Sequence, residues 1–93
     1  MPTYLVDYDL NAPGKDYEKL IEKIVGLGQG HYHVLKSSWF MYHSTYTATD
    51  LYNYLCPVLD KTDRIFVTQV TSNNFGWLDK DAWEWLKKAL ASQ

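Results

Sequence analysis

Two aspartates near the start of the chain are the residues whose type and spacing could do chemistry. Asp7 and Asp9 stand two positions apart in Thr3–Asp9, a segment rich in β-branched and aromatic residues and therefore predicted to be a strand. Side chains two apart on a strand share a face at about 6–7 Å, and two such carboxylates can hold Mg²⁺ or Mn²⁺ and orient a water for attack on a phosphodiester. Without a metal, Asp9 would instead cap a turn predicted at Asn11–Gly14, and Asp7 would be solvated.

Three histidines are a second candidate for chemistry. His31, His33 and His43 have equal parity in the long segment His31–His43, so an unbroken strand would place all three on one side. His31 and His33 would then form a metal pair or an acid–base pair. A bulge or break at the polar centre, Lys36–Ser38, would separate His43 from the other two. Histidines at the ends of strands are usually just solvent-facing.

The aromatic and basic residues offer a binding surface rather than a reaction. Aromatic residues make up 16% of the chain, with eight tyrosines and four tryptophans. Tyrosine and tryptophan stack on nucleobases and are also enriched at protein interfaces. One small core cannot enclose all four tryptophans, so a subset is available to hold a base at a cleft between subunits. The predicted ligand contacts, which combine stacking rings, cations for phosphate and polar side chains, are Lys36, Ser38, Trp39, Arg64, Asn74 and Trp77.

Length, charge and cysteine content limit the class of protein. The chain has 93 residues, a formal net charge of −2 and one cysteine, Cys56. The length predicts a single domain, residues 1–93, that buries only about 60–65% of its unfolded surface unless it pairs with a copy of itself. The acidic balance argues against coating duplex DNA by bulk electrostatics. A single cysteine forms no internal disulfide, which favours a reducing, cytoplasmic location, and no apolar run approaches the roughly 18 residues of a membrane span.

The elements that must position these residues follow from periodicity. Apolar residues recur at helical spacing from Lys15 to Leu27 and again after Thr47, whose spacing to Asp50 predicts a capping box. Pro57 is expected to kink or tighten the last turn of that second helix. The remaining predicted elements are, in order, a strand, a short edge strand and a terminal helix: Arg64–Thr71, Phe75–Leu78 and a helix that starts at Asp79.

The order of these elements predicts the fold class. With His31–His43 counted as two strands, the order is βαββαβ followed by a C-terminal helix, which indicates an α+β, ferredoxin-like fold with two helices on one face of an antiparallel sheet. The predicted strands carry apolar residues at both odd and even positions. In the last strand, for example, Ile65 and Val67 point to one face and Phe66 and Val70 to the other. The second face of the sheet must therefore be covered as well. The terminal helix, a second subunit or both are the candidates.

Short motifs along this order resemble the CRISPR-associated protein 2 family. The motifs end the first strand, lie in the second strand of the hairpin and open the last strand: Tyr8-Asp9, Ser38-Trp39-Phe40 and Asp63-Arg64-Ile65-Phe66-Val67. The chain resembles the stand-alone, SinR-like relatives even more closely, and the virulence-associated protein D ribonuclease toxins more loosely. The resemblance covers Pro2 to about Leu90. It implies a ferredoxin-like homodimer in which Asp9 occupies the position where some members place a metal-binding aspartate from each subunit.

Two functions from different classes follow from these features. The first is a small homodimeric nuclease of toxin or defence type that acts on nucleic-acid or nucleotide phosphates with Mg²⁺ or Mn²⁺, with Asp9 as catalytic residue and metal ligand and Asp7 as a second ligand. The alternative is a non-catalytic homo-oligomer that binds or sequesters a nucleotide in phage–host conflict, and a plain dimeric scaffold is a third reading. Acidity, the single arginine (Arg64) and the aromatic excess favour a small nucleotide or single strand over a long duplex.

Overall fold

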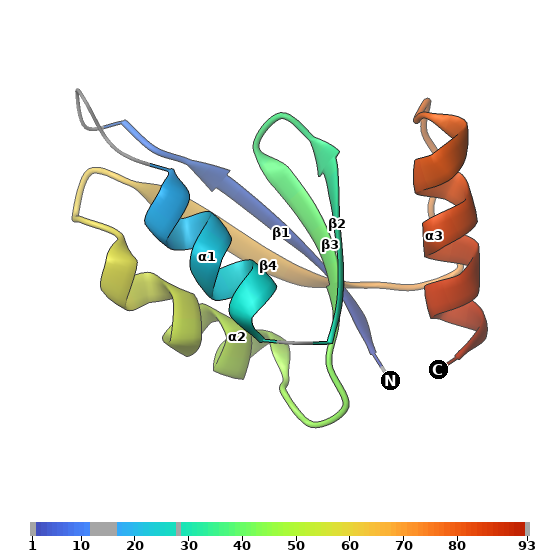
Figure 1. Cartoon of the computed structure of the whole chain (residues 1–93), viewed down its shortest axis with the longest axis horizontal. Coiled ribbons are helices and arrows are strands. Elements are labelled where there is room, and N and C mark those ends of the chain that lie inside the picture. Colours follow the sequence, from blue (N-terminus) through green and yellow to red (C-terminus); the bar gives the residue numbers. More distant parts are fainter. Residues whose placement is uncertain (1, 12–16, 28, 93) are drawn as a thin grey trace.

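A computed structural model of the chain describes residues 2–11, 17–27 and 29–92. The described residues form one antiparallel sheet in the strand order β2-β3-β1-β4, with helices on both sides of it (Figure 1). The elements are β1 Thr3–Asp9, α1 Glu18–Gly26, β2 Gly30–Leu35, β3 Ser38–Tyr42, α2 Ala48–Leu55, the 3₁₀ turn η1 Cys56–Val58, β4 Arg64–Val70 and α3 Lys80–Ala91. The fold is α+β, as the sequence predicts. None of the described helices is both long enough and apolar enough to cross a bilayer.

β1 lies in the interior of the sheet, between β3 and β4. Its pairing with β3 ends at Asp7, which lies opposite Ser38, whereas its pairing with β4 continues to Asp9, which lies opposite Arg64. One further backbone bond, from the Tyr8 amide to the Ser37 carbonyl (3.0 Å), ties β1 to the turn between β2 and β3. The end of β1 therefore projects past β3 at the same end of the sheet as this turn.

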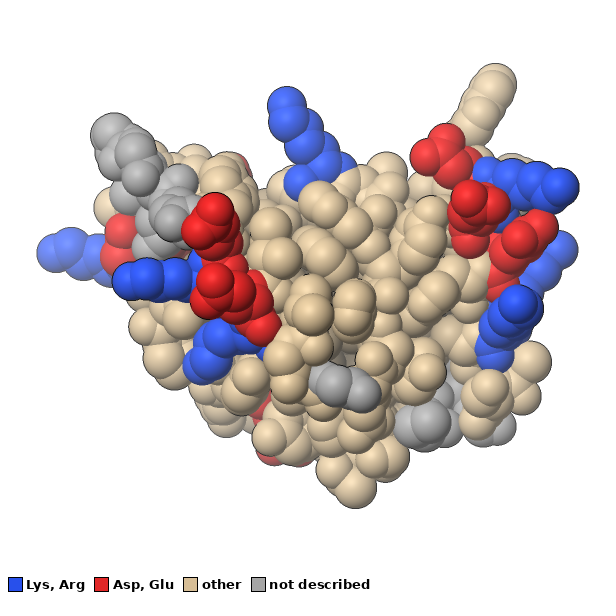
Figure 2. Space-filling view, in the orientation of Figure 1, with Lys and Arg blue, Asp and Glu red and all other residues tan. Residues whose placement is uncertain are grey.

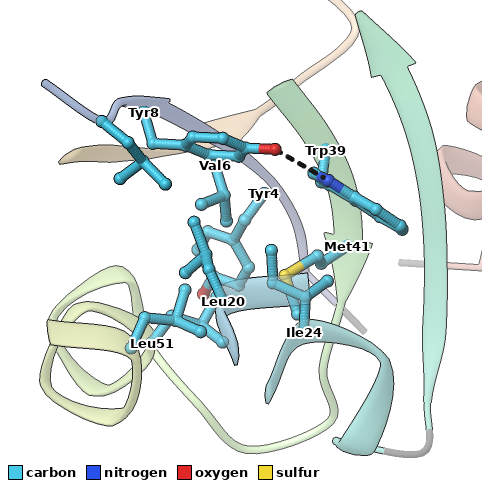
Figure 3. Close-up of a cluster of buried hydrophobic side chains, with 10 residues drawn as sticks. Tyr4, Val6, Tyr8, Leu20, Ile24, Trp39, Met41 and Leu51 are labelled. Atoms are coloured by element: carbon cyan, nitrogen blue, oxygen red, sulfur yellow. Dashed lines mark hydrogen bonds between the residues drawn. The ribbon is translucent and has the colours of Figure 1, made fainter. Parts of the chain in front are cut away.

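The first face of the sheet carries the main core, between the strands and helices α1 and α2 (Figure 3). Alternation along β1 sends Tyr4, Val6 and Tyr8 into this core and leaves Asp7 and Asp9 exposed together on the other side. The helices contribute fully buried leucine and isoleucine side chains: Leu20, Ile24, Leu51 and Leu55. This packing fixes which face of β1 presents the two carboxylates.

The second face is covered by α3, one of the predicted candidates (Figure 1). Ala82, Leu86 and Ala89 are buried, and the ring of Trp85 lies 5.8–6.1 Å from three aromatic rings of β2 and β3: Tyr32, Phe40 and Tyr42. The cover is incomplete, because Leu35 and Phe66 remain 54% and 66% exposed. Two apolar side chains of the second face therefore stay open near the end of the sheet that carries Asp7 and Asp9.

The predicted break in the hairpin is confirmed, and the predicted edge strand at Phe75–Leu78 is wrong. Residues 36–37 form a turn, and the pairing of β2 with β3 shifts register between His33 and Leu35. Phe75–Leu78 lies instead in an irregular linker, residues 71–79. Its strand propensity is overridden by a tight turn in which the Asn74 amide and side chain bond to the carbonyls of Ser72 and Thr71. This turn directs the chain away from the sheet towards α3.

The start of α2 carries the predicted capping box. The Asp50 amide donates to Thr47 Oγ1 (3.2 Å), and the Thr47 amide donates to the Asp50 carboxylate (2.9 Å). Pro57 lies in η1, so the helix tightens at its end as predicted. The cap matters to the core because α2 contributes Leu51 one turn later and Leu55 two turns later.

The capping box gives a direct test of this packing. Replacing Thr47 by alanine leaves the Asp50 amide unpaired, and we expect the free energy of unfolding to fall by about 1 kcal/mol in urea titrations. Thr49→Ala is the matched control, because Thr49 is exposed within α2 and takes no part in the capping box. Equal stability of the two variants would contradict a structural role for the box.

Candidate functional site

Asp7 and Asp9 project from the same side of β1, at the end of the sheet where β1 extends past β3. Both side chains are exposed. Asp7 accepts a hydrogen bond from the hydroxyl of Ser38 (2.9 Å), and Ser38 itself is buried. Asp9 lies beyond the last β1–β3 pair. Ser38 thus orients one carboxylate, while the other stands at the projecting tip.

One hollow flanks this tip on the second face of the sheet, and we call it the Phe66 hollow. It has a volume of about 340 Å³ and is lined by Asp7, Tyr8, Asp9, Ser37, Arg64, Ile65 and Phe66. The guanidinium of Arg64 donates from Nη1 to the carbonyls of Lys61 (3.2 Å) and Asp63 (2.9 Å). Within the described residues its Nε and Nη2 make no hydrogen bond, so these donors are available to an anion.

A second hollow flanks the tip on the first face, beside α1, and we call it the Tyr17 hollow. It has a volume of about 390 Å³ and is lined by Tyr8, Asp9, Tyr17, Ile21, His33, Lys36 and Ser37. Lys36 is exposed at the β2–β3 turn. His33 is held by its Nε2 to the Lys36 carbonyl (3.2 Å) and by stacking on Trp39, with ring centroids 4.4 Å apart. This side of the tip therefore also offers a cation, Lys36, close to the aromatic rings of Tyr17 and His33.

A buried aspartate braces the backbone around the site. Asp63 is 7% exposed, and its carboxylate accepts from the amides of Asn11 (3.1 Å) and Asp60 (3.0 Å). The Asn11 side chain also donates to the Thr62 carbonyl (3.1 Å). These bonds join the chain just after β1 to the turn just before β4. They hold Asp9 opposite Arg64. Apart from Asn11, the predicted turn at Asn11–Gly14 lies outside the described residues.

Tyr8 forms the wall between the two hollows and connects the site to the core. Its hydroxyl accepts a hydrogen bond from Trp39 Nε1 (3.3 Å), shown in Figure 3. Burial raises the pKa of the Tyr8 phenol above its usual value of 10.0, and the nearby Tyr17 and Asp7 raise it further, against a lowering by the Trp39 bond. Tyr8 is therefore a neutral wall and not a source of protons near neutral pH.

The donor set fits a divalent cation shared with a phosphate rather than a closed protein cage. No cluster of three or more histidine, cysteine or acidic side chains that could hold a metal ion occurs in the part of the chain that the structure describes. Asp7 and Asp9 supply two hard oxygen ligands, and Mg²⁺ is commonly held by one or two carboxylates together with substrate phosphates and water. The structure thus offers two of the ligands of such a site, and phosphate and water would supply the others.

The histidines fall into two groups, as expected for a broken strand. His31 and His33 lie against the ring of Trp39. His43 follows β3 at the far end of the hairpin, is 8% exposed and accepts the amides of Thr45 (3.2 Å) and Tyr46 (3.1 Å) at Nδ1. His43 therefore holds the loop before α2 and has no part in the site.

The structure brings together some of the predicted ligand contacts and separates the others. Lys36 and Arg64 line the two hollows, and Ser38 reaches the site through Asp7. Trp39 is 6% exposed in the core. Asn74 and Trp77 lie in the linker and border a separate apolar groove of about 440 Å³ on the second face.

Sequence reasoning did not place three residues in the site: Tyr17, Ser37 and Phe66. Phe66 lies opposite Asp7 in the pairing of β1 with β4. The two residues are 59 positions apart in the sequence, so no local pattern predicts that they meet. Ser37 could have been found from its place in the polar turn next to Ser38. Tyr17 carries a weaker signal, because it heads the apolar stripe of the first helix and lies 6.0 Å from the ring of Tyr8.

Comparison of the chain with protein-family models, with curated proteins and with solved structures found no match.

The raised pKa of Tyr8 predicts how stability depends on alkaline pH. Because the folded-state pKa lies above the unfolded value, the stabilisation is complete below about pH 10 and is lost as the pH rises from there through the raised pKa. Tyr8→Phe removes this titration, so we expect urea unfolding at pH 8 and pH 11 to differ less for the variant than for the wild type. Tyr52→Phe, at an exposed position on α2, is the control and should behave as the wild type. An unchanged pH dependence in Tyr8→Phe would contradict the buried, neutral phenol.

Proposed function

We propose that the protein is a small homodimeric nuclease that acts on nucleotide or single-stranded nucleic-acid phosphates with Mg²⁺ or Mn²⁺. The observation that carries this proposal is the projecting end of β1, where Asp7 and Asp9 share one side of the strand. Arg64 lines the hollow on one face of this end, and Lys36 lines the hollow on the other. A site that cleaves a phosphodiester with a metal ion combines carboxylates that bind the metal with cations that bind the phosphate.

Each side chain has a defined task in this proposal. Arg64 Nε and Nη2 and the Lys36 ammonium bind the phosphate oxygens, and charge-assisted bonds of this kind are about twice as strong as neutral ones. Asp7 and Asp9 would hold the metal ion, which when bound neutralises phosphate charge and lowers the pKa of a water molecule. Ser38 keeps Asp7 in one orientation, as outer partners of metal ligands commonly do.

The homodimer is supported by the linker between β4 and α3. Phe75 and Trp77 are each 99% exposed, beside the apolar groove that includes Leu5, Phe40 and Leu86. Each such ring offers about 150–250 Å² for burial. Two linkers and the surfaces that they cover would bury about 1,200–2,000 Å², which is the standard size of a specific interface. A linker and groove on the same chain can pair reciprocally about a two-fold axis.

The strand order supports the finer part of the fold proposal. An antiparallel sheet in the order β2-β3-β1-β4, built from βαββαβ with α1 and α2 on one face, is the arrangement expected of a ferredoxin-like domain. We therefore keep the resemblance to the CRISPR-associated protein 2 and SinR-like proteins as part of the proposal. A toxin or defence role follows from that resemblance alone, and a cytoplasmic location follows from the single cysteine.

The nuclease proposal predicts the effects of two substitutions on cleavage. With purified protein, Mg²⁺ or Mn²⁺ and labelled single-stranded RNA and DNA, Asp9→Asn should abolish cleavage, because the tip carboxylate is lost. Ser38→Ala should reduce cleavage by about 10–100-fold, because Asp7 loses its orienting hydroxyl. The matched control is Asp81→Asn, which removes an exposed carboxylate from the first turn of α3 and should cleave as the wild type.

Two outcomes would contradict catalysis at this site. Cleavage that survives in Asp9→Asn and does not need a metal would mean that the activity arises elsewhere. A nucleotide that raises the thermal midpoint in the presence of Mg²⁺ but is recovered chemically unchanged would replace the nuclease by the alternative, a protein that sequesters a nucleotide.

The homodimer predicts a mass of twice 10.9 kDa in light scattering after size exclusion. Phe75→Ser with Trp77→Ser should shift the mass to that of one chain, because both exposed rings of the linker are lost. Val25→Ser with Tyr52→Ser changes two exposed apolar residues on α1 and α2 and should leave the dimer intact. A single-chain mass for the wild type at concentrations of tens of micromolar would contradict the dimer.

A further inference from the structure

The projecting end of β1 divides the site into two halves on opposite faces of the sheet. The Phe66 hollow and the Tyr17 hollow share Tyr8, Asp9 and Ser37 as a common wall. Phe66 extends from the second face, opposite Asp7 in the pairing of β1 with β4. Tyr17 approaches from the first face, where its ring lies 6.0 Å from that of Tyr8. A ligand that fills both hollows must pass over the tip of β1.

The two halves repeat one combination of groups. Each hollow contains one cation and at least one exposed ring, Arg64 with Phe66 on one face and Lys36 with Tyr17 on the other. Phe66 is 66% exposed and Tyr17 is 43% exposed, so both rings have a free surface on which a base can stack. The shared wall carries Asp9, the carboxylate assigned to the metal. The repeated combination points to a ligand made of two similar units joined by a charged centre.

The volumes set the size of each unit. The hollows measure about 340 and 390 Å³, at the lower end of the range of about 300–1,000 Å³ that is typical of small-molecule sites. Each hollow thus suits a single nucleoside rather than a longer segment. Because a strand of the sheet separates them, two bases bound in this way cannot stay stacked on each other.

We propose that the site is built for one phosphodiester step of a single strand, with one nucleoside in each hollow and the linking phosphate at the tip formed by Asp9 and Ser37. This inference rests on the proposed function, and it names the substrate class as a dinucleotide or an unpaired dinucleotide step. A duplex is excluded, because its neighbouring bases are stacked and paired. The charge pattern agrees with this exclusion, because the face seen in Figure 2 shows acidic and basic side chains mixed, without the continuous basic stripe that a duplex backbone needs.

A comparison of a dinucleotide with a mononucleotide tests the proposal. Binding of adenylyl-3′,5′-adenosine and of adenosine monophosphate is measured by titration calorimetry, with Ca²⁺ in place of Mg²⁺ to slow turnover. A second stacked base contributes about 1–3 kcal/mol, so the dinucleotide should bind at least about fivefold more tightly. Equal affinity of the two ligands would overturn the proposal.

Ring variants show whether both hollows are used. Tyr17→Ala and Phe66→Ala should each weaken dinucleotide binding by about fivefold or more, while only one of them should weaken mononucleotide binding. Tyr52→Ala, which removes an exposed ring from α2, should change neither. Loss of dinucleotide affinity in only one of the two site variants would overturn the two-hollow arrangement. The two cations are tested in the same way. Lys36→Gln and Arg64→Gln should each weaken dinucleotide binding, whereas Lys61→Gln, whose side chain lines neither hollow, should not.

The result is separable from that of the proposed function. A dinucleotide preference with no cleavage in Mg²⁺ would support the two-hollow site and contradict the nuclease. Cleavage that depends on Asp9, with equal affinity for mononucleotide and dinucleotide, would support the nuclease and contradict the two-hollow site.

Discussion

The unequal pairing of β1 is the constraint on which the rest of the structure depends. Its ladder with β3 ends at Asp7, while its ladder with β4 continues to Asp9, and the Tyr8 amide is satisfied by the turn at Ser37. This mismatch leaves a short tip of β1 that projects past β3 and has a hollow on either face. Because Tyr8 must stay in the core beneath α1, the alternation of the strand turns Asp7 and Asp9 to the opposite side. The carboxylates are thus held by backbone pairing on a rigid element, as a precise site requires.

The distribution of aromatic residues connects packing to binding. Trp39 and Trp85 pack on opposite faces of the sheet, Trp39 in the main core and Trp85 against three rings of β2 and β3. Phe75 and Trp77 are left outside, in a linker next to an apolar groove. Exposing two large rings is unfavourable for an isolated chain, and the homodimer that we propose would remove that cost. The same aromatic content that a small core requires also provides the rings beside Asp9.

Local features of the fold were predictable from the sequence, and long-range ones were not. The parity of β1, the box formed by Thr47 and Asp50, and the break after Leu35 are each encoded within a few neighbouring residues, and all three are present. The two aspartates were found for the same reason. Phe66 and Asp63 reach the site through contacts about 50–60 positions apart, set by strand register and a buried carboxylate, so a scan of local patterns missed them. Trp39 was assigned to the ligand surface because the residues next to it in the sequence do not predict its hydrogen bond to Tyr8 in the core. Phe75–Leu78 has the composition of a strand, and the turn at Asn74 prevents it from joining the sheet.

We propose above all that Asp7 and Asp9 hold a divalent cation together with a phosphate at the tip of β1. The most direct measurement is paramagnetic line broadening by Mn²⁺ in amide NMR spectra, recorded with and without adenylyl-3′,5′-adenosine. The account predicts that broadening strengthens when the nucleotide is added and is greatest for Asp7, Tyr8, Asp9, Ser37 and Arg64, with little effect on α3. Broadening centred on the acidic residues of α3, or unchanged by the nucleotide, would contradict it.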